Sequence, residues 1–301
     1  MTLIPYSRSR KTPRVPQGVR VEGGRLAGLR RQIKQSCAFG LSAALAATAA
    51  SGAGTAQSPA HAADFEAIYG AYFLGLKVMQ TELEARFRPD SYEVRSMYRT
   101  DGLISWIKQD EIVSMVNGRT DGERLSPAHF QHRDVLQRGR TVTMNFAPDD
   151  IEVTAEPPYS TFGEPPATQP HRRGALDLVS GIMQASMNID DDPAYPCGRD
   201  IPIFNGKERY DLRMAYAGRV EAETDGYTGP AIACHVYYIP VAGFDPDDVP
   251  EEKYLNTPLT VWFTDTEEHD FHIPVRFSYP VGIGTLVIEA KSLSLQSAAA
   301  R

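Results

Sequence analysis

The chain has 301 residues, with 31 basic and 38 acidic side chains and a formal net charge of −7 at neutral pH. An acidic surface repels phosphate backbones and anionic lipid head groups, which argues against nucleic-acid binding and against electrostatic docking on membranes. The length suits one large domain, or one domain with a sizeable insertion.

The first 62 residues have the composition of a secretory signal peptide. Nine basic residues precede residue 35, and an apolar stretch from Cys37 to about Ala50 follows them. This stretch is shorter than the ~18 residues that a membrane-spanning helix needs. Ala60-His61-Ala62 provides the small residues at which a signal peptidase cleaves. We therefore predict that residues 1–62 are a cleaved signal peptide.

Removal of this segment leaves 239 residues with 22 basic and 37 acidic side chains, a net charge of −15. We expect residues 63–301 to form a single β-rich domain, exported to the periplasm and without a transmembrane segment. The general secretory route is favoured over the twin-arginine route, because the residues around Arg30-Arg31 match the twin-arginine signal only in part.

Alternation of apolar and polar residues recurs through the mature chain and is typical of strands with one buried face. The alternating segments are residues 92–100, 140–147, 210–217, 259–265, 272–280 and 284–295. Turn signals such as Asn117-Gly118, Asn205-Gly206 and Asp225-Gly226 separate them. The pattern predicts a largely antiparallel sheet of nine to eleven strands.

One insertion, at about residues 157–188, breaks the alternation. Its first part, residues 157–170, is rich in proline and predicts an exposed, extended loop. In its second part, apolar residues fall at helical spacing: Leu176, Val179, Ile182 and Met183. We expect an amphipathic helix of about three turns whose apolar face packs on the sheet.

Two cysteines remain after cleavage, Cys197 and Cys234. In an oxidising compartment an even pair favours a disulfide, which would contribute roughly 3–4 kcal/mol by closing a loop of a few dozen residues. Buried free thiols are the alternative. A tetrahedral metal site would need two further ligands.

Four stretches of the chain resemble a known family. They are AYFLGLKVMQTELEARFRPDSYEVRSMYRTDGLISWI, FNGKERYDLRMAY, CHVYYIPVAGF and IPVRFSYPVGIGTLVIEA. In order and spacing they resemble the family known only as domain of unknown function 3108, found in exported bacterial proteins, over about residues 67–295. The resemblance implies an envelope protein with a curved antiparallel sheet, similar to the open half-barrel of periplasmic lipoprotein carriers and receptors. It implies no established activity and no catalytic residues.

The expected fold is therefore mainly β: a curved, open, half-barrel-like antiparallel sheet with one packed amphipathic helix. Such a sheet can enclose an apolar trough. The aromatic residues of the alternating strands would line it: Tyr98, Tyr210, Tyr216, Phe263 and Phe277. Alternatively, the same residues form the core beneath the helix.

The sequence offers little sign of catalytic chemistry. The pairs His129/His132 and His269/His272 have a spacing that places both rings on one side only in a helix or turn. The acidic runs at 190–192 and 245–252 do not match a calcium-binding loop, and no Gly-x-Ser-x-Gly elbow is present. We expect no catalytic residue, no metal site and no cofactor.

These observations leave three classes of function. The first is a non-catalytic binding or carrier protein for a hydrophobic, lipid-like ligand. The second is a structural or assembly factor of the envelope that acts through protein contacts, and the third is a hydrolase. A large apolar cavity would favour the first class, and a filled core with an exposed apolar patch would favour the second.

Overall fold

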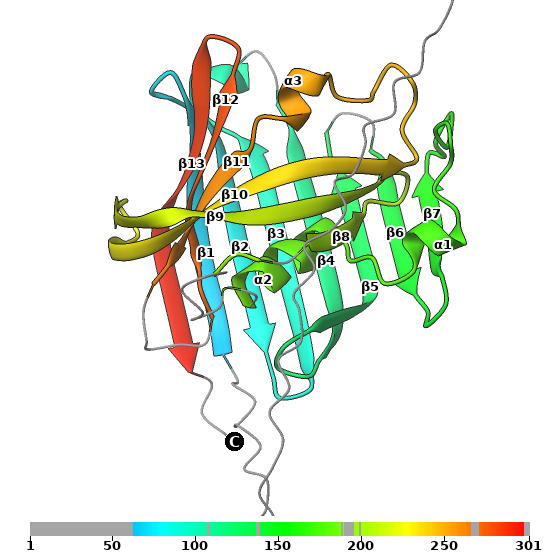
Figure 1. Cartoon of the computed structure of the whole chain (residues 1–301), viewed down its shortest axis with the longest axis horizontal. Helices are drawn as coiled ribbons and strands as arrows, with labels where there is room; N and C mark the ends of the chain where they lie inside the picture. The colour runs from blue at the N-terminus through cyan, green and yellow to red at the C-terminus, as the bar shows by residue number, and fades with distance from the viewer. Residues whose placement is uncertain are drawn as a thin grey trace, which may run out of the picture. The chain divides into compact units, whose positions relative to one another are not determined.

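The alternating segments form strands of one antiparallel sheet (Figure 1). The computed structural model of the protein describes residues 63–106, 109–136, 139–187, 189, 196–198, 200–265 and 271–297. The predicted signal peptide, residues 1–62, lies outside the described residues.

The described chain contains thirteen strands and four short helices. The strands are β1 (Ala63–Phe73), β2 (Leu76–Phe87), β3 (Ser91–Thr100), β4 (Glu111–Thr120), β5 (Leu125–Asp134), β6 (Thr141–Phe146), β7 (Ile151–Glu156), β8 (Asp200–Phe204), β9 (Arg209–Glu223), β10 (Thr228–Ala242), β11 (Leu259–Thr264), β12 (Pro274–Val281) and β13 (Gly284–Ser297). The helices are the 3-10 helix η1 (Gly102–Trp106) and the α-helices α1 (Gln169–Arg172), α2 (Leu178–Met187) and α3 (Glu252–Leu255).

The strand order is β7-β6-β5-β4-β3-β2-β1-β13-β12-β11-β10-β9-β8, so β7 and β8 are the two edges of an open sheet. The predicted fold class, mainly β with a half-barrel-like antiparallel sheet, is confirmed. The expected number of strands was too low. Strands such as β5 break the alternation, because its ladder with β4 shifts register between Asn117 and Gly118 and it contains Pro127.

The long β9–β10 hairpin runs across strands β1 to β6 in Figure 1. At one end, Gly206 in the β8–β9 turn lies against Val142 of β6 and Val153 of β7. At the other end, Gly226 in the β9–β10 turn donates its N–H to the carbonyl of Ala290 on β13, at 3.0 Å. The hairpin therefore spans the concave side of the half-barrel and touches both flanks.

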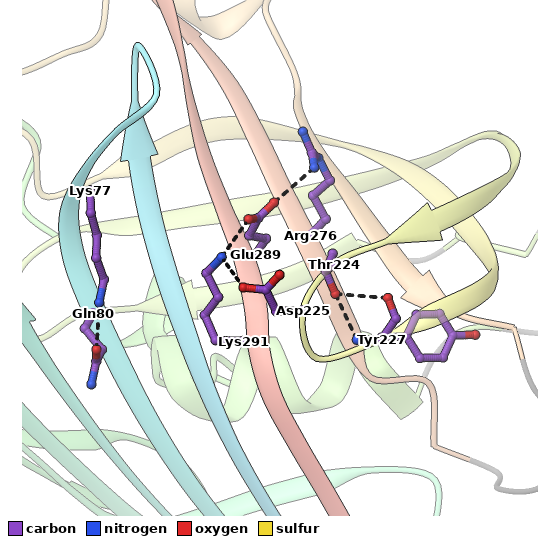
Figure 2. Close-up of polar contacts among 8 residues, drawn as sticks. All are labelled: Lys77, Gln80, Thr224, Asp225, Tyr227, Arg276, Glu289 and Lys291. Carbon is purple, nitrogen blue, oxygen red and sulfur yellow. Dashed lines mark hydrogen bonds and ion pairs between the residues drawn. The ribbon is translucent and has the colours of Figure 1, made fainter.

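Ion pairs attach the β9–β10 turn to β13 (Figure 2). Lys291 Nζ donates to Asp225 at 2.9 Å and to Glu289 at 3.0 Å, and Arg276 donates to Glu289 at 3.2 Å. Lys291 also lies 4.6 Å from the ring centroid of Tyr72. Exposed pairs contribute little stability singly, so this network chiefly fixes where the turn lies.

Two clusters of buried side chains form the core. The first extends over β1 to β7 and includes Phe65, Tyr92 and Met144. The second lies among β8 to β11 and includes Ile203 and Phe263. Strand β9 contributes to both clusters, because its ladder with β10 shifts register between Ala233 and Cys234.

Candidate functional site

Helix α2 fills the interior of the half-barrel. It contacts β3, β4, β5 and β8, and Met183 on it is fully buried. Gly181 allows a close approach, because a Cβ atom there would collide with Cδ1 of Ile203. The predicted amphipathic helix is therefore present and packs on the sheet.

Helix α2 begins later than the apolar spacing predicts. Asp177 precedes the helix and accepts a hydrogen bond from the Ser180 N–H at 2.9 Å, the geometry of an N-cap. Leu176, expected in the helix, instead bridges to β8: its N–H donates to Pro202 and its carbonyl accepts from Phe204, both at 2.8 Å. The cap overrides the apolar periodicity at this end.

A buried polar chain joins the helix to the sheet. The Ser180 hydroxyl donates to Asp177 Oδ2 at 2.6 Å, and the Tyr92 hydroxyl lies 2.7 Å from Ser180 Oγ. Burial raises the pKa of Asp177 and also that of Tyr92. Asp177 and Ser180 have no exposed surface, so a substrate in solution cannot reach them. The Tyr92–Ser180–Asp177 hydrogen bonds therefore anchor α2 to the sheet.

Two further contacts anchor the rest of the helix. Gln184 accepts from the Leu125 N–H at 2.7 Å and donates to the Glu123 carbonyl at 2.8 Å. The Ser186 carbonyl accepts from the His272 N–H at 3.1 Å. Since buried polar groups are costly to leave without partners, these contacts fix α2 against the concave face.

The five aromatic residues expected to line a trough do not all come together. Tyr210 and Phe263 are buried in the second cluster, and the half-buried Phe277 packs against it. Tyr98 is half-buried on β3, and Tyr216, beside the register shift of β9, is 43% exposed. Tyr210, Phe263 and Phe277 therefore contact core side chains.

Cys197 and Cys234 are both buried in the second cluster, with their sulfur atoms at the distance of a disulfide bond. The pair links the segment before β8 to the middle of β10, 37 residues away in sequence. The pair therefore fixes the segment before β8 against β10, where Cys234 lies opposite Val261 of β11.

The histidine pair of β5 is divided between two partners. His129 Nδ1 lies 2.8 Å from Asn145 Oδ1, and His132 Nδ1 lies 2.9 Å from Ser114 Oγ. His269 and the acidic run 190–192 lie outside the described residues. Within the described residues, no group of three or more His, Cys, Asp or Glu side chains could hold a metal ion.

A half-open groove of about 400 Å³ lies at the β7 edge of the sheet. This volume is in the range of small-molecule sites. The groove is lined by the start of β7, the Pro-rich loop, α1 and the β8–β9 turn: Asp150, Ile151, Glu152, Val153, Phe162, Ala167, Arg172, Phe204, Gly206 and Lys207.

The groove has an apolar floor and an apolar rim. Phe204 is buried at 2% exposure, and Val153 and Ala167 are half-buried and pack against the first cluster. Phe162, by contrast, is 64% exposed. The Pro-rich loop that carries it is held in place by two backbone bonds, from Glu164 N–H to Phe244 and from Gly243 N–H to Pro165, both at 2.8 Å.

The cations of the groove are neutralised by carboxylates. Arg172 donates to both oxygens of Asp150, at 2.8 and 2.7 Å, and these bonds hold the pKa of Asp150 below its usual value. Lys207 Nζ donates to Asp245 at 2.7 Å. The groove therefore suits a ligand with an apolar part, which would lie on Phe204, Val153 and Ala167, and with hydrogen-bonding groups that would face the charged side chains.

The backbone of β7 forms one wall of the groove. Its register with β6, and the bond from the Ala147 N–H to the Asp150 carbonyl, place the backbone groups of Ile151, Val153 and Ala155 on the outer side. The Ile151 N–H donates to the Asp150 carboxylate at 2.8 Å. No backbone partner lies on the outer side of Val153 among the described residues.

Sequence reasoning missed the groove. It predicted an exposed Pro-rich loop but not that Arg172 of the following helix would bind Asp150, 22 residues earlier. The available signal was Phe162, a large apolar residue in the middle of a polar, Pro-rich stretch.

The model of the family described as "Protein of unknown function (DUF3108)" matches residues 64–291. The chain belongs to this family. This match confirms the resemblance seen in the sequence. No curated protein matches this DUF3108 protein at a significant level.

Solved structures similar to this DUF3108 protein include a β-barrel-like protein of domain of unknown function DUF1849 from Brucella abortus. That match has 10% identity, a TM-score of 0.42, and covers 78% of this chain and 99% of the other. A hypothetical protein from Chlamydia trachomatis matches with 9% identity, a TM-score of 0.33, and coverage of 78% and 89%. Among the described residues, no helix has both the length and the apolar character needed to span a membrane.

Proposed function

We propose that this DUF3108 protein is an exported, non-catalytic binding protein of the cell envelope, and that it holds a hydrophobic, lipid-like ligand in the groove beside β7. The observation that carries the proposal is the groove itself, with about 400 Å³ of half-open space and an exposed aromatic rim at Phe162. The filled interior supports placing the ligand at this edge.

The chemistry of the groove supports an acyl-chain ligand with a polar head. Phe204, Val153 and Ala167 offer apolar contact along the floor. The Lys207 ammonium has three donors, of which one is used by Asp245. A carbonyl or ester oxygen of the ligand would find donors in Lys207 and in the outer backbone of β7.

A second candidate function, assembly through protein contacts, is favoured by the same strand. The uncovered edge of β7 can add a strand from a partner. Two of its three exposed side chains, Glu152 and Glu156, are acidic, and the third is Thr154, so we expect the partner's strand to carry basic residues. A hydrolase has less support, because the buried Tyr92–Ser180–Asp177 chain is closed to solvent.

The test is native mass spectrometry of the full chain, expressed in a bacterial host and purified from the periplasm without detergent. We expect a polypeptide that begins after residue 62, with a discrete excess mass that organic extraction removes. Ala167→Phe, which fills the groove, should lose the excess mass. Ala128→Phe makes the same addition at an exposed position of β5, outside the groove, and should keep it.

Two results would overturn the proposal. If the wild-type protein carries no extractable mass, it holds no bound lipid-like ligand. An excess mass that persists in Ala167→Phe would place the ligand elsewhere. An unprocessed N-terminus, with the protein absent from the periplasm, would overturn the export part alone.

A further inference from the structure

Four large apolar side chains stand in solvent at one end of the sheet. Leu74 and Leu76 are 59% and 57% exposed, and Trp106 and Ile283 are 88% and 92% exposed. They come from three separate turns: the β1–β2 turn, η1 and the β12–β13 turn. We call these four residues the apolar tips.

The three turns are neighbours in space. Leu74 lies against the position of Gly284, next to Ile283, so the two hairpin turns touch. Helix η1 is held to β2 by the Asp101 N–H, which donates to the Val78 carbonyl at 3.0 Å. Figure 1 shows both hairpin tips at the same end of the sheet, at the upper left. The apolar tips therefore form one surface.

The three turns that carry the apolar tips have no net charge, although the protein as a whole is acidic. The segments 73–77, 101–106 and 279–285 contain one base, Lys77, and one acid, Asp101. The two form an ion pair at 2.7 Å, and Lys77 also donates to Gln80 at 2.9 Å, as Figure 2 shows. The acidic residues that give the chain its net negative charge lie outside these three segments.

We propose that the apolar tips dock the protein on a lipid surface by inserting into the interfacial layer of a zwitterionic bilayer. Trp is enriched at this layer, and large apolar side chains beside it anchor peripheral proteins by burial. The three turns add no net charge of their own, so they avoid the repulsion that acidic parts of the surface would meet. Tyr72 and Lys291, which are in contact with each other near the base of the hairpins, suit the head-group level.

The shape of the surface favours a bilayer over a folded protein partner. The side chains project from three turns that succeed each other around the end of the sheet, and the described grooves lie elsewhere, at β7 and over β1, β2 and β13. A fluid layer accepts projecting side chains at any spacing, whereas a protein partner needs a matching hollow for each one.

The test is co-sedimentation of the purified full-chain protein with vesicles of phosphatidylcholine and phosphatidylethanolamine. We expect the wild type to bind and the double variant Trp106→Asp, Ile283→Asp to lose binding on the order of tenfold or more. Met115→Asp makes the same kind of change on β4, at a residue that is 46% exposed and lies outside both the apolar tips and the groove, and it should bind as the wild type does. Circular dichroism confirms that each variant is folded.

Tryptophan fluorescence gives a second readout. Trp106 and the half-buried Trp262 are the two tryptophans, so a blue shift on adding vesicles that disappears in Trp106→Phe would locate the insertion. Wild-type protein that stays in the supernatant, or an equal loss of binding in Met115→Asp, would overturn the proposal. So would sedimentation velocity showing that the double variant abolishes a dimer, because the surface would then belong to a second copy of this chain.

Discussion

The interior of the half-barrel is filled by α2, whereas the groove beside β7, which is lined by both apolar and charged side chains, leaves about 400 Å³ of open space. In the interior, α2 lies against the sheet and its buried polar groups are bonded. At the groove, the Pro-rich loop is held above β7 and leaves Phe162 in solvent. The difference shows that the concavity of a sheet does not by itself locate a binding site; what covers the concave face decides.

The largest expected effect is in the interior. Met183→Ala removes a fully buried side chain of α2 and should lower the free energy of unfolding by about 2–5 kcal/mol. Leu178→Ala on the same helix, 43% exposed, should change it by about 0.5 kcal/mol or less. Urea unfolding of both variants checks this. Equal effects would mean that α2 does not pack as a core helix.

The next effect is at the cysteine pair. Cys197→Ser together with Cys234→Ser should cost about 2–4 kcal/mol, because the unfolded chain gains the freedom of the 37-residue loop. Urea unfolding of the wild type, with and without reductant, gives the same comparison. Ligand retention should be unaffected, because the pair lies in the second cluster and not at the groove.

The helix cap gives a smaller effect that depends on pH. Burial raises the folded-state pKa of Asp177 above its ordinary value of 3.8. The folded chain therefore holds this proton more tightly than the unfolded chain. The contribution of Asp177 is then most favourable below the unfolded pKa and is lost as pH rises through the folded pKa.

Two substitutions separate the charge from the cap. Asp177→Asn keeps an N-cap acceptor and removes the buried charge, so it should flatten the decline in stability above about pH 4. Asp177→Ala removes the cap and should cost about 1–2 kcal/mol. Urea unfolding across the pH range measures both. A decline that is just as steep in Asp177→Asn would show that Asp177 is not its source.

The smallest effect on stability is expected at the groove. Phe162→Ala changes a side chain that is 64% exposed and should alter the free energy of unfolding by about 0.5 kcal/mol or less. It should nevertheless weaken binding of a fluorescent fatty acid several-fold, on the order of the loss of one aromatic contact. Fluorescence titration measures the affinity. Unchanged affinity would show that Phe162 does not contact the ligand.

Much of the fold could be predicted from local patterns. Alternation identified strands such as β3 and β9, and the glycines around Ile283 identified the β12–β13 turn. The pairing of Arg209 with Asp211, at 2.8 Å, was also within reach, because the two residues are neighbours on β9. These features depend on residues close together in sequence.

The groove could not be predicted, because it depends on contacts between distant segments. Arg172 meets Asp150, the Pro-rich loop meets Gly243, and the β8–β9 turn meets Val153. Periodicity also cannot tell whether an inward-facing residue such as Tyr210 faces a void or a helix. The answer depends on where α2 lies, and contacts between distant segments of the chain determine that position.

The most direct test of the groove is photo-crosslinking of a diazirine-labelled fatty acid to the purified full-chain protein, followed by peptide mapping. We predict adducts on residues 150–167 and 204–207, around Phe162 and Phe204. Adducts on α2, or on the interior strands around Tyr92 and Tyr210, would show that the ligand enters the half-barrel, which would contradict a binding site in the groove beside β7.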